Sequence, residues 1–525
     1  MDALISLVPI VALFVLMLWV RMSGWGSALV ALCITCVLGI WFSPLAFNNT
    51  VAVSSGETVG WSLVEGIVKA IYPILPIILM AIFSYNILVA SGAVNVIKRQ
   101  FTGFSDDKGI LVLMVVWGFG GLLEGMAGFG TAVAIPASIL IGLGYKPIFS
   151  ALVSLLGNTM STAFGAVGVP ILTLCTEASP GGAPTSEIIR EICTFSVIQL
   201  SPLYIIIPIL ILFLSDHNRI GRNFILGTFV GLVSLVTTFL CALYLGPETP
   251  GIISSIASIC AIILYVKVTG ENGSNVDTPS FAESLKAWSA YIITLLLILL
   301  TGPLIPSAEV WLKNHAVTII TIPCIESTFN LRWLGNSAVW LFVGSVSAGL
   351  IQGLGMMSIL RQVCITIYNL RFTALTIVAL IAMSSVMSHT GMINSLASGM
   401  VNISGRMYPF FAPLVGAIGT FVTGSFTSSN ILFGHLQYQV AMMSGLGDLN
   451  GHFLGMHGNG ANWLVAANTT GATGGKLISP QSIAIATAAC DMKDADDIIM
   501  RKAIPFAIGY ILLGGLTVFI PLCLH

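Results

Sequence analysis

The chain has 525 residues, of which 56% are hydrophobic and 8% are charged, whereas soluble domains carry about three times that charged share. Its 20 Lys and Arg against 21 Asp and Glu give a formal net charge of −1. This excludes the basic surface that a nucleic-acid binder needs and the high net charge of a disordered chain. We therefore expect most of the surface to face lipid, and we predict an all-α polytopic membrane protein.

Apolar runs that could cross a bilayer recur along the whole chain, since such a helix needs about 20 predominantly apolar residues. The predicted spans are 3–20, 25–42, 66–90, 148–175, 192–214, 223–245, 251–268, 286–303, 336–356, 372–388 and 503–524. Further apolar sequence fills 110–141 and 409–490. The first run has no basic segment before it and no cleavage site after it, so we expect it to be a retained span and not a signal peptide.

The short connections between these runs carry charges of alternating sign. One set holds Arg21, Lys98/Arg99, Arg219/Arg222, Lys267/Lys286, Arg361/Arg371 and Arg501/Lys502, and the other holds Glu57, Glu177/Glu187 and Glu248. By the positive-inside rule the basic set is cytoplasmic. This predicts a multi-pass protein of the cell's inner (plasma) membrane with both termini outside.

That alternation holds only if 98–176 and 409–490 each cross the membrane an odd number of times. Each region is too long for one helix and is interrupted by glycines, so it holds either three crossings or one crossing plus a re-entrant hairpin. We favour hairpins, because non-helical backbone at membrane depth survives only where it lines a polar cavity. The predicted architecture has about twelve transmembrane helices plus two re-entrant hairpins.

The polar segment 269–285 divides this architecture into two halves of similar length. We predict an N-terminal half at 1–268 with its hairpin in 110–141, a cytoplasmic linker at 269–285, and a C-terminal half at 286–525 with its hairpin in 409–435. Asn158-Thr159 and Asn468-Thr469 are each followed by a glycine seven residues after the asparagine and a proline twelve residues after it. Interrupted segments in matching positions of two halves are typical of inverted-repeat secondary transporters and mark their binding sites.

Small polar residues gather in these interrupted segments. Six hydrogen-bonding side chains occur within 423–430, and six glycines occur within 118–130. Such residues can hold a ligand at helix N-termini, which favour anions, although the glycines alone fit tight helix packing equally well. The predicted substrate-binding residues are Gly128, Phe129, Gly130, Thr131, Asn158, Thr159, Ser425, Thr427, Ser428, Ser429, Asn430, Asn468, Thr469 and Lys476.

Ionisable side chains at membrane depth are costly and so indicate function. Glu124 stands in an apolar stretch with no basic neighbour in sequence, which suits a proton-coupling carboxyl, and a structural carboxyl is the alternative. His389 could relay protons near neutral pH or simply sit at a helix end. Lys476 could attract an anion, with a snorkelling interfacial lysine as its alternative.

Four segments carry a resemblance to a known family: EGMAGFGTAVAIPASILIGLGYKP (124–147), GNTMSTAFGAVGVPI (157–171), TGSFTSSNILFGHLQ (423–437) and AANTTGATGGKLISPQSIAIA (466–486). In this order they resemble the lactate permease family of bacterial and archaeal proton symporters. The resemblance implies a carrier of about twelve spans that moves lactate or glycolate with a proton. Phe426 departs from the family's usual acid, Ala132 from its proline, and 444–462 is longer than usual.

These observations together predict a secondary active transporter, not an enzyme, that imports a small 2-hydroxymonocarboxylate with a proton. Its partners are the carboxylate, the proton and the lipid bilayer, with no cofactor, metal or nucleic acid, and the oligomeric state stays open, a homodimer included. A sodium-coupled carboxylate carrier is the nearest alternative. A membrane-embedded hydrolase is a more distant one, based on the G-x-S match at Gly335–Ser337.

Overall fold

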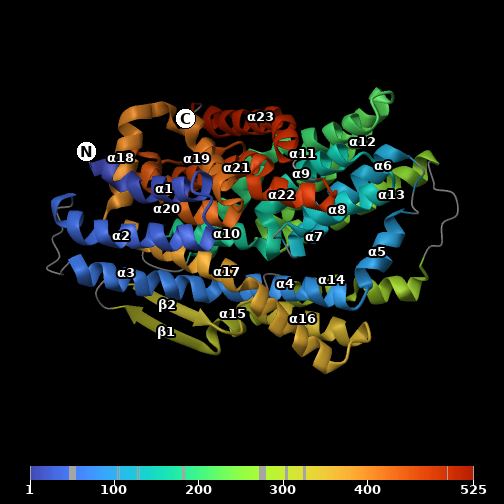
Figure 1. The fold of residues 1–525 in the computed structure, drawn as a ribbon, viewed down its shortest axis with the longest axis horizontal. Helices are drawn as coiled ribbons and strands as arrows, with labels where there is room; N and C mark the ends of the chain where they lie inside the picture. Colours follow the sequence, from blue (N-terminus) through green and yellow to red (C-terminus); the bar gives the residue numbers. More distant parts are fainter. Residues whose placement is uncertain are drawn as a thin grey trace.

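The computed structural model describes residues 2–46, 55–102, 105, 107–126, 128, 130–179, 184–270, 279–301, 305–322, 327–492 and 495–523. These residues are almost entirely helical, which confirms the all-α prediction (Figure 1). Two short antiparallel hairpins are the exceptions within the described ranges: β1 (Val317–Ile322) pairs with β2 (Ser327–Arg332), and β3 (Asn450–Phe453) with β4 (Met456–Asn459).

Ten helices in the described part of the chain are long and apolar enough to cross a membrane. One of them, 108–126, belongs to a re-entrant hairpin, so nine of the ten are crossings. The shorter helices α1 and α16 and the broken pair α21–α22 bring the number of crossings to twelve. The unbroken crossings are α1 (Asp2–Leu18), α2 (Gly24–Ala46), α11 (Ser186–Ser215), α12 (Ile220–Tyr244), α13 (Pro250–Thr269), α14 (Phe281–Thr301), α16 (Ser337–Ile351), α17 (Met356–His389) and α23 (Asp496–Cys523). An even number of crossings leaves both termini on one side, and Figure 1 shows both ends in the same half of the molecule.

Two predicted spans differ most from the structure in where they begin. The third crossing begins at Ser55 and not at 66: α3 (Ser55–Lys69) continues through a π-helical turn, kinked at Tyr72, into α4 (Leu75–Ala90). Tyr72 precedes a proline, and that position disfavours helical geometry. The placement of Arg361 and Arg371 in a connection was wrong, because both lie within α17. This helix is longer than a bilayer is thick, so Arg361 in its second turn can lie outside the hydrocarbon core.

The first re-entrant hairpin enters through α6 (Lys108–Leu113), a π-helical turn (Met114–Phe119) and α7 (Gly120–Met126), and it returns through α8 (Thr131–Gly142). Its tip contains Gly128 and Gly130, whose φ angles of 62° and 86° lie in the region that glycine alone adopts freely. At the open end, the Tyr145 hydroxyl donates a hydrogen bond to the Lys108 carbonyl at 2.6 Å. Both ends of the hairpin therefore lie at the same face.

The second re-entrant hairpin consists of α19 (Tyr408–Thr423) and α20 (Phe426–Met443), which pack side by side. Gly424 turns the chain at its tip with φ 69°. Near the open end, the Gln437 side chain donates to the Ala412 carbonyl at 3.0 Å and accepts from the Tyr408 hydroxyl at 2.9 Å. The predicted pair of hairpins is confirmed.

Each hairpin is followed by a crossing that is broken partway. In the first half, α9 (Pro147–Ser161) leads through a 3-10 turn (Thr162–Phe164) into α10 (Gly165–Glu177), and in the second half α21 (Gly460–Ile478) leads into α22 (Pro480–Ala489). The break at the start of α10 holds Ala166, Val167 and Gly168 in left-handed conformation. For the two non-glycine residues this costs roughly 1–2 kcal/mol each. The repeated order of hairpin and broken crossing accounts for the echo in the sequence.

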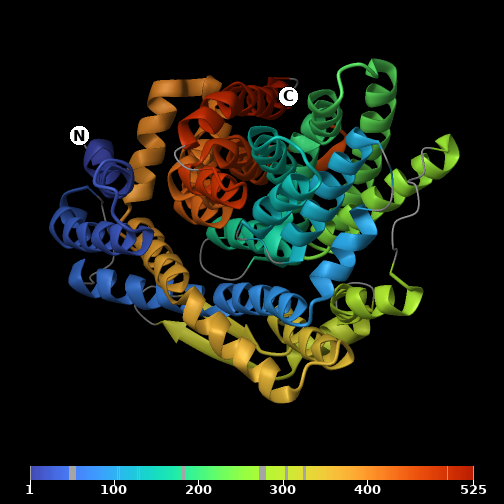
Figure 2. The same ribbon diagram turned by 45° about the vertical axis from the view of Figure 1, so that its right-hand side comes forward.

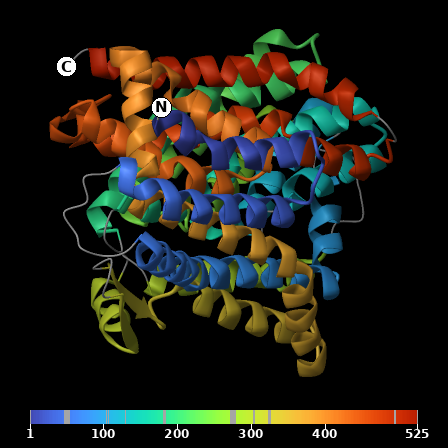
Figure 3. The same cartoon turned by 60° about the vertical axis from the view of Figure 1, so that its left-hand side comes forward.

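The helices form two groups that face each other. We call α6–α13 with α19–α23 the body, and α1–α4 with α14, α16 and α17 the arm (Figure 2). The arm carries β1–β2 and α15 (Pro306–Asn314), while α5 (Ala93–Thr102) connects it to the body and α18 (Met392–Ser404) packs between α1 and α20. In Figure 3 the blue and gold helices of the arm lie below the body, while the dark-blue N-terminal helices run beside the orange and red helices of the body. Both hairpins and both broken crossings belong to the body.

Candidate functional site

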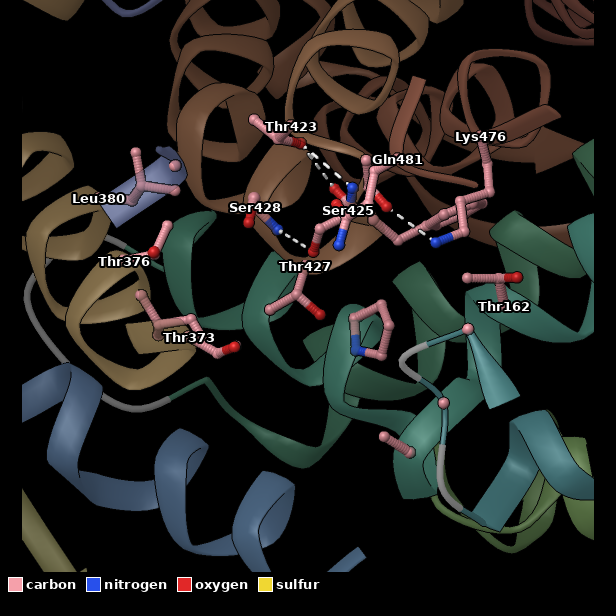
Figure 4. A pocket seen from close by; sticks show the side chains of 18 of the residues that line it. Thr162, Thr373, Thr376, Leu380, Thr423, Ser425, Thr427, Ser428, Lys476 and Gln481 are labelled. Carbon is pink, nitrogen blue, oxygen red and sulfur yellow. Dashed lines mark hydrogen bonds between the residues drawn. The ribbon is translucent and has the colours of Figure 1, made fainter. Parts of the chain in front are cut away.

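A cavity of about 340 Å³ lies where the two hairpin tips and the two helix breaks meet the arm (Figure 4). The body contributes Glu124, Gly128 and Gly130 of the first hairpin, 423–428 of the second, Thr162, Gly165, Ala166 and Pro170 of the first break, and Lys476, Gln481 and Ile485 of the second. The arm contributes residues of α1, α2 and α17. The predicted interrupted segments therefore surround one space.

Four helix N-termini border this cavity. Gly130 is the N-cap of α8, Ser425 is the N-cap of α20, Pro170 lies where α10 regains helical geometry, and Gln481 lies in the first turn of α22. Each N-terminus carries free N–H groups and a partial positive charge. Their convergence from both halves gives the cavity a field that favours an anion.

Lys476 and Glu124 supply the charges of the cavity. The Lys476 ammonium donates a hydrogen bond to the Gly424 carbonyl at 2.8 Å, which holds its charge at the tip of the second hairpin. Glu124 is 3% exposed, interacts electrostatically with Lys476, and contacts the Thr162 side chain at the first break. Its Oε2 atom is buried without a hydrogen-bond partner among the described residues. One acid from the first half and one base from the second half thus line the same cavity.

Hydroxyl groups line the opposite walls. On the body side, Ser425 caps α20 by accepting from the Ser428 amide at 3.2 Å, and Thr427 extends into the cavity beside them (Figure 4). On the arm side, Thr373 and Thr376 of α17 lie across from them. A small hydroxy acid between these walls meets both donors and acceptors.

Sequence reasoning missed the arm side of the cavity together with Thr162 and Gln481. The signal was weak but present, since Thr373 and Thr376 are hydroxyl residues three apart on an apolar helix. Trp25 of α2 and Phe372 of α17 also line the cavity, with ring centroids stacked at 5.5 Å. Together they form an apolar part of the cavity wall, which no local sequence motif predicts.

Four of the predicted substrate-binding residues are buried behind the cavity and hold the second hairpin in place. The Asn430 amide donates to the Pro170 carbonyl at 2.8 Å and to the Thr469 hydroxyl at 3.3 Å. Asn468 donates to the Asn430 side chain at 2.8 Å, and the Ser429 hydroxyl donates to the Gly416 carbonyl at 2.8 Å. These bonds attach the hairpin to both broken crossings, so the four residues position the lining residues.

Three further predicted residues also stand off the cavity wall. Thr131 closes the first hairpin tip by donating to the Gly128 carbonyl at 2.9 Å. Thr159 donates to the carbonyl of Leu156 at 2.7 Å, and Asn158 is buried beside it. Phe129 lies outside the described residues.

His389 also lies away from the cavity. Its Nε2 is 2.6 Å from Glu65 Oε2, and the other oxygen of Glu65 is 3.2 Å from the Lys69 ammonium. Ser385 donates to the same carboxylate at 3.0 Å. The structure thus places His389 in an ion-pair network between α3 and α17.

Two departures of this sequence from the family pattern, Phe426 and the segment 444–462, can be located in the structure. Phe426 is 1% exposed at the start of α20 and lines the cavity. The segment 444–462 contains β3–β4, which is attached to α11 because Glu191 accepts from the Asn459 backbone amide at 3.1 Å and the Asn462 side chain at 2.8 Å.

The G-x-S match marks the start of α16. Asn336 caps the helix by accepting from the Ala338 amide at 2.9 Å, and Ser337 donates to Glu248 at 3.3 Å. A helix cap and a hydroxyl–carboxylate hydrogen bond account for this motif.

Comparisons with known proteins agree with this geometry. A sequence profile of the L-lactate permease family matches residues 2–524. The L-lactate permease of Streptococcus iniae is 36% identical over 446 residues, which cover 84% of this chain and 91% of that protein. The glycolate permease GlcA of Escherichia coli is 30% identical over 548 residues, which cover 96% and 92%.

Two solved structures share the fold. The YdaH transporter of Alcanivorax borkumensis aligns with a TM-score of 0.53 at 13% identity, covering 95% of this chain and 98% of that one. MtrF of Neisseria gonorrhoeae aligns with a TM-score of 0.50 at 13% identity, covering 94% and 95%. At this identity the likeness concerns fold alone, and it is to multi-pass helical transporters. With the family profile matching essentially its whole length, the chain belongs to the L-lactate permease family.

Proposed function

We propose that this permease imports a small 2-hydroxymonocarboxylate of the lactate or glycolate class together with a proton. The observation that carries the proposal is the single cavity that joins four helix N-termini, one lysine and one buried glutamate. The names of the relatives from Streptococcus iniae and Escherichia coli agree with this substrate class.

In the proposed complex the substrate carboxylate binds beside Lys476 and the N-terminus of α20. A charge-assisted hydrogen bond to the ammonium adds to the field of the helix ends. The 2-hydroxyl group bonds to the hydroxyls of Ser425, Thr427 or Ser428. Thr373 and Thr376 complete the site from the arm, so a substrate bound here touches both groups of helices.

Glu124 couples the proton. When Glu124 is ionised, a bound carboxylate places two negative charges against the single positive charge of Lys476. Proton binding to Glu124 removes one of them, and at this depth each unpaired charge is costly. Anion and proton therefore favour each other, and one of each crosses without net charge.

The charges of the connections give the orientation of the chain in the membrane, and the order of the hairpins and crossings divides it into two halves. We place the basic ends of the helices in the cytoplasm, which puts both termini outside the plasma membrane. The halves are 1–268 and 286–525, joined through 269–285 on the cytoplasmic side.

Uptake by proteoliposomes tests this function. With the purified protein, labelled lactate or glycolate should accumulate when the outside is more acidic, and a proton ionophore should abolish accumulation. Accumulation that requires a sodium gradient at equal pH would select the sodium-coupled alternative, since hairpin carbonyls can also coordinate a hard cation. Absence of both uptake and counterflow for these acids would refute the substrate class.

A further inference from the structure

A second polar cluster lies beyond the edge of the cavity along α17. Leu380 is the last α17 residue on the cavity wall, and one turn further along Ser384 donates a hydrogen bond to Glu177 Oε2 at 2.8 Å. After another turn, Ser388 Oγ lies 3.0 Å from His435 Nε2. Glu177 and His435 are 6% and 7% exposed. These bonds join α17 of the arm to α10 and α20 of the body.

The contacts of His435 indicate which of its ring nitrogens carries a hydrogen. Its Nδ1 lies 3.0 Å from the Glu177 main-chain oxygen, which can only accept, so Nδ1 carries a hydrogen. Its Nε2 lies 3.2 Å from the side-chain nitrogen of Gln439, which can only donate. A neutral ring that carries its hydrogen on Nδ1 and none on Nε2 therefore fits every contact. In this form Nε2 accepts from the Gln439 amide and from the Ser388 hydroxyl.

Three neighbouring elements, α3, α10 and α17, bring charged or titratable groups near this ring. Glu65 and Lys69 lie on α3, Glu177 ends α10, and His389 lies on α17 beside the serines. His435 interacts electrostatically with Lys69, His389 and Glu65. Protonation of His435 would place an N–H group opposite the N–H₂ group of Gln439, and these two donors repel each other. The charged ring would also be attracted to the Glu177 carboxylate, where it competes with the hydrogen bond from Ser384.

We propose that His435 is a second proton-binding site, distinct from Glu124, whose neutral form closes the outer end of the cavity and whose protonated form releases α17. The word outer rests on the orientation in the proposed function. The cluster joins the end of α10, the last turns of α17 and the middle of α20. The ends of α10 and α17 are remote from the basic connections, so the cluster meets protons from the outside first. A proton bound here opens the cavity to external substrate before Glu124 is loaded.

Hydrogen–deuterium exchange of the full-length protein in detergent tests the proposal without a substrate. Between about pH 8 and about pH 5, exchange of 384–389 and 433–443, corrected for its intrinsic pH dependence, should rise about fivefold or more in the wild-type protein. The range extends to about pH 5 because burial disfavours the charged form of a histidine. In His435→Gln the rise should disappear, because glutamine donates and accepts like the neutral ring but binds no proton. His217→Gln, an exposed histidine in a distant loop, should behave like the wild type.

A wild-type protein whose exchange does not change with pH would overturn the proposal. The same holds if His435→Gln retains the full change, or if only His389→Gln removes it. Transport is read separately: wild-type protein that moves neither lactate nor glycolate refutes the proposed substrate class, while exchange still reports whether His435 closes the cavity.

Discussion

The ammonium group of Lys476 lies 2.8 Å from the main-chain oxygen of Gly424, which fixes the positive charge of the second broken crossing at the tip of the second hairpin. Glu124 of the first hairpin interacts with that charge from the other half of the chain. A substrate carboxylate that binds Lys476 therefore acts on both hairpins at once.

Replacing Lys476 with methionine should abolish high-affinity substrate binding. The change keeps the apolar part of the side chain at nearly its full length but removes a charge-assisted hydrogen bond worth about 1.5–3 kcal/mol, so the Kd should rise about 10- to 150-fold. Lys476→Arg should lose less, because the charge remains. Calorimetric titration with lactate or glycolate measures the affinities, with Lys502→Met on an exposed stretch of α23 as control. Equal affinities for Lys476→Met and wild type would remove Lys476 from the site.

The substitution Glu124→Gln should leave substrate exchange across the membrane intact while removing its coupling to the proton gradient. The amide keeps the shape and the contact with Thr162 but cannot release a proton, so the site should behave as permanently neutral. Accumulation driven by a pH gradient should fall about tenfold or more, whereas counterflow at equal pH should continue. If uptake by Glu124→Gln still follows the pH gradient, another group carries the proton.

The sequence predicted the interrupted segments well, because their residue types are unusual for a membrane-spanning helix. The hydroxyls at 425, 427 and 428 predicted an interrupted segment, because they have no use on a lipid-facing helix, whereas the glycines at 128 and 130 fitted tight helix packing equally well. It could not distinguish lining residues from supporting ones: Asn430 and Thr427 are equally polar, but Asn430 points away to the Pro170 carbonyl. That difference depends on the rotation of α20 against α10, a tertiary property.

The arm side of the site and the role of His389 were beyond local patterns. Thr373 reaches the cavity because α17 crosses the hairpin tips, whereas His389 lies four turns further along the same helix and pairs with Glu65. Long-range packing of α17 against α2 and α3 decides both placements. The positive-inside rule likewise could not show that Arg361 and Arg371 continue a helix, because it reads charge and not helix length.

Alanine at Gly424 should impair transport through the hairpin tip. Gly424 has φ 69°, and an added Cβ would come within 2.7 Å of the Gln481 Cβ, so α22 would have to move. Gly92 is a matched control, with φ 76° and open space around an added Cβ. Both alanine variants should lose about 1–2 kcal/mol to the left-handed backbone.

Initial uptake rates and thermal unfolding in detergent separate the two effects. Gly424→Ala should transport about tenfold more slowly than Gly92→Ala, because a lasting misplacement of the tip weakens binding geometry. Equal transport by the two variants would show that contact between Gly424 and Gln481 does not matter for the site.

Asp107 should make the entry to the first hairpin sensitive to acid. Its side chain caps α6 by accepting from the Ile110 amide at 3.0 Å and pairs with Arg222 and Arg219. Burial alone raises the pKa of Asp107, but the hydrogen bonds from Arg222 and Ile110 and the two arginine charges together lower it below its ordinary value. A carboxyl whose pKa is lowered on folding stabilises the protein above its unfolded pKa and loses that contribution as the pH falls through the folded pKa.

Thermal unfolding of Asp107→Asn as a function of pH measures this contribution. Asparagine still caps the helix but removes the ion pairs, so the variant should be less stable by about 1 kcal/mol at neutral pH, a modest value because the site lies at a partly wetted edge. The gap should stay constant down to about pH 4 and shrink below it, since the wild-type carboxyl then becomes protonated. Asp497→Asn, which removes an exposed partner of Arg501, should show no such gap. A difference between Asp107→Asn and wild type that persists in strong acid would mean that shape, and not charge, holds the hairpin entry.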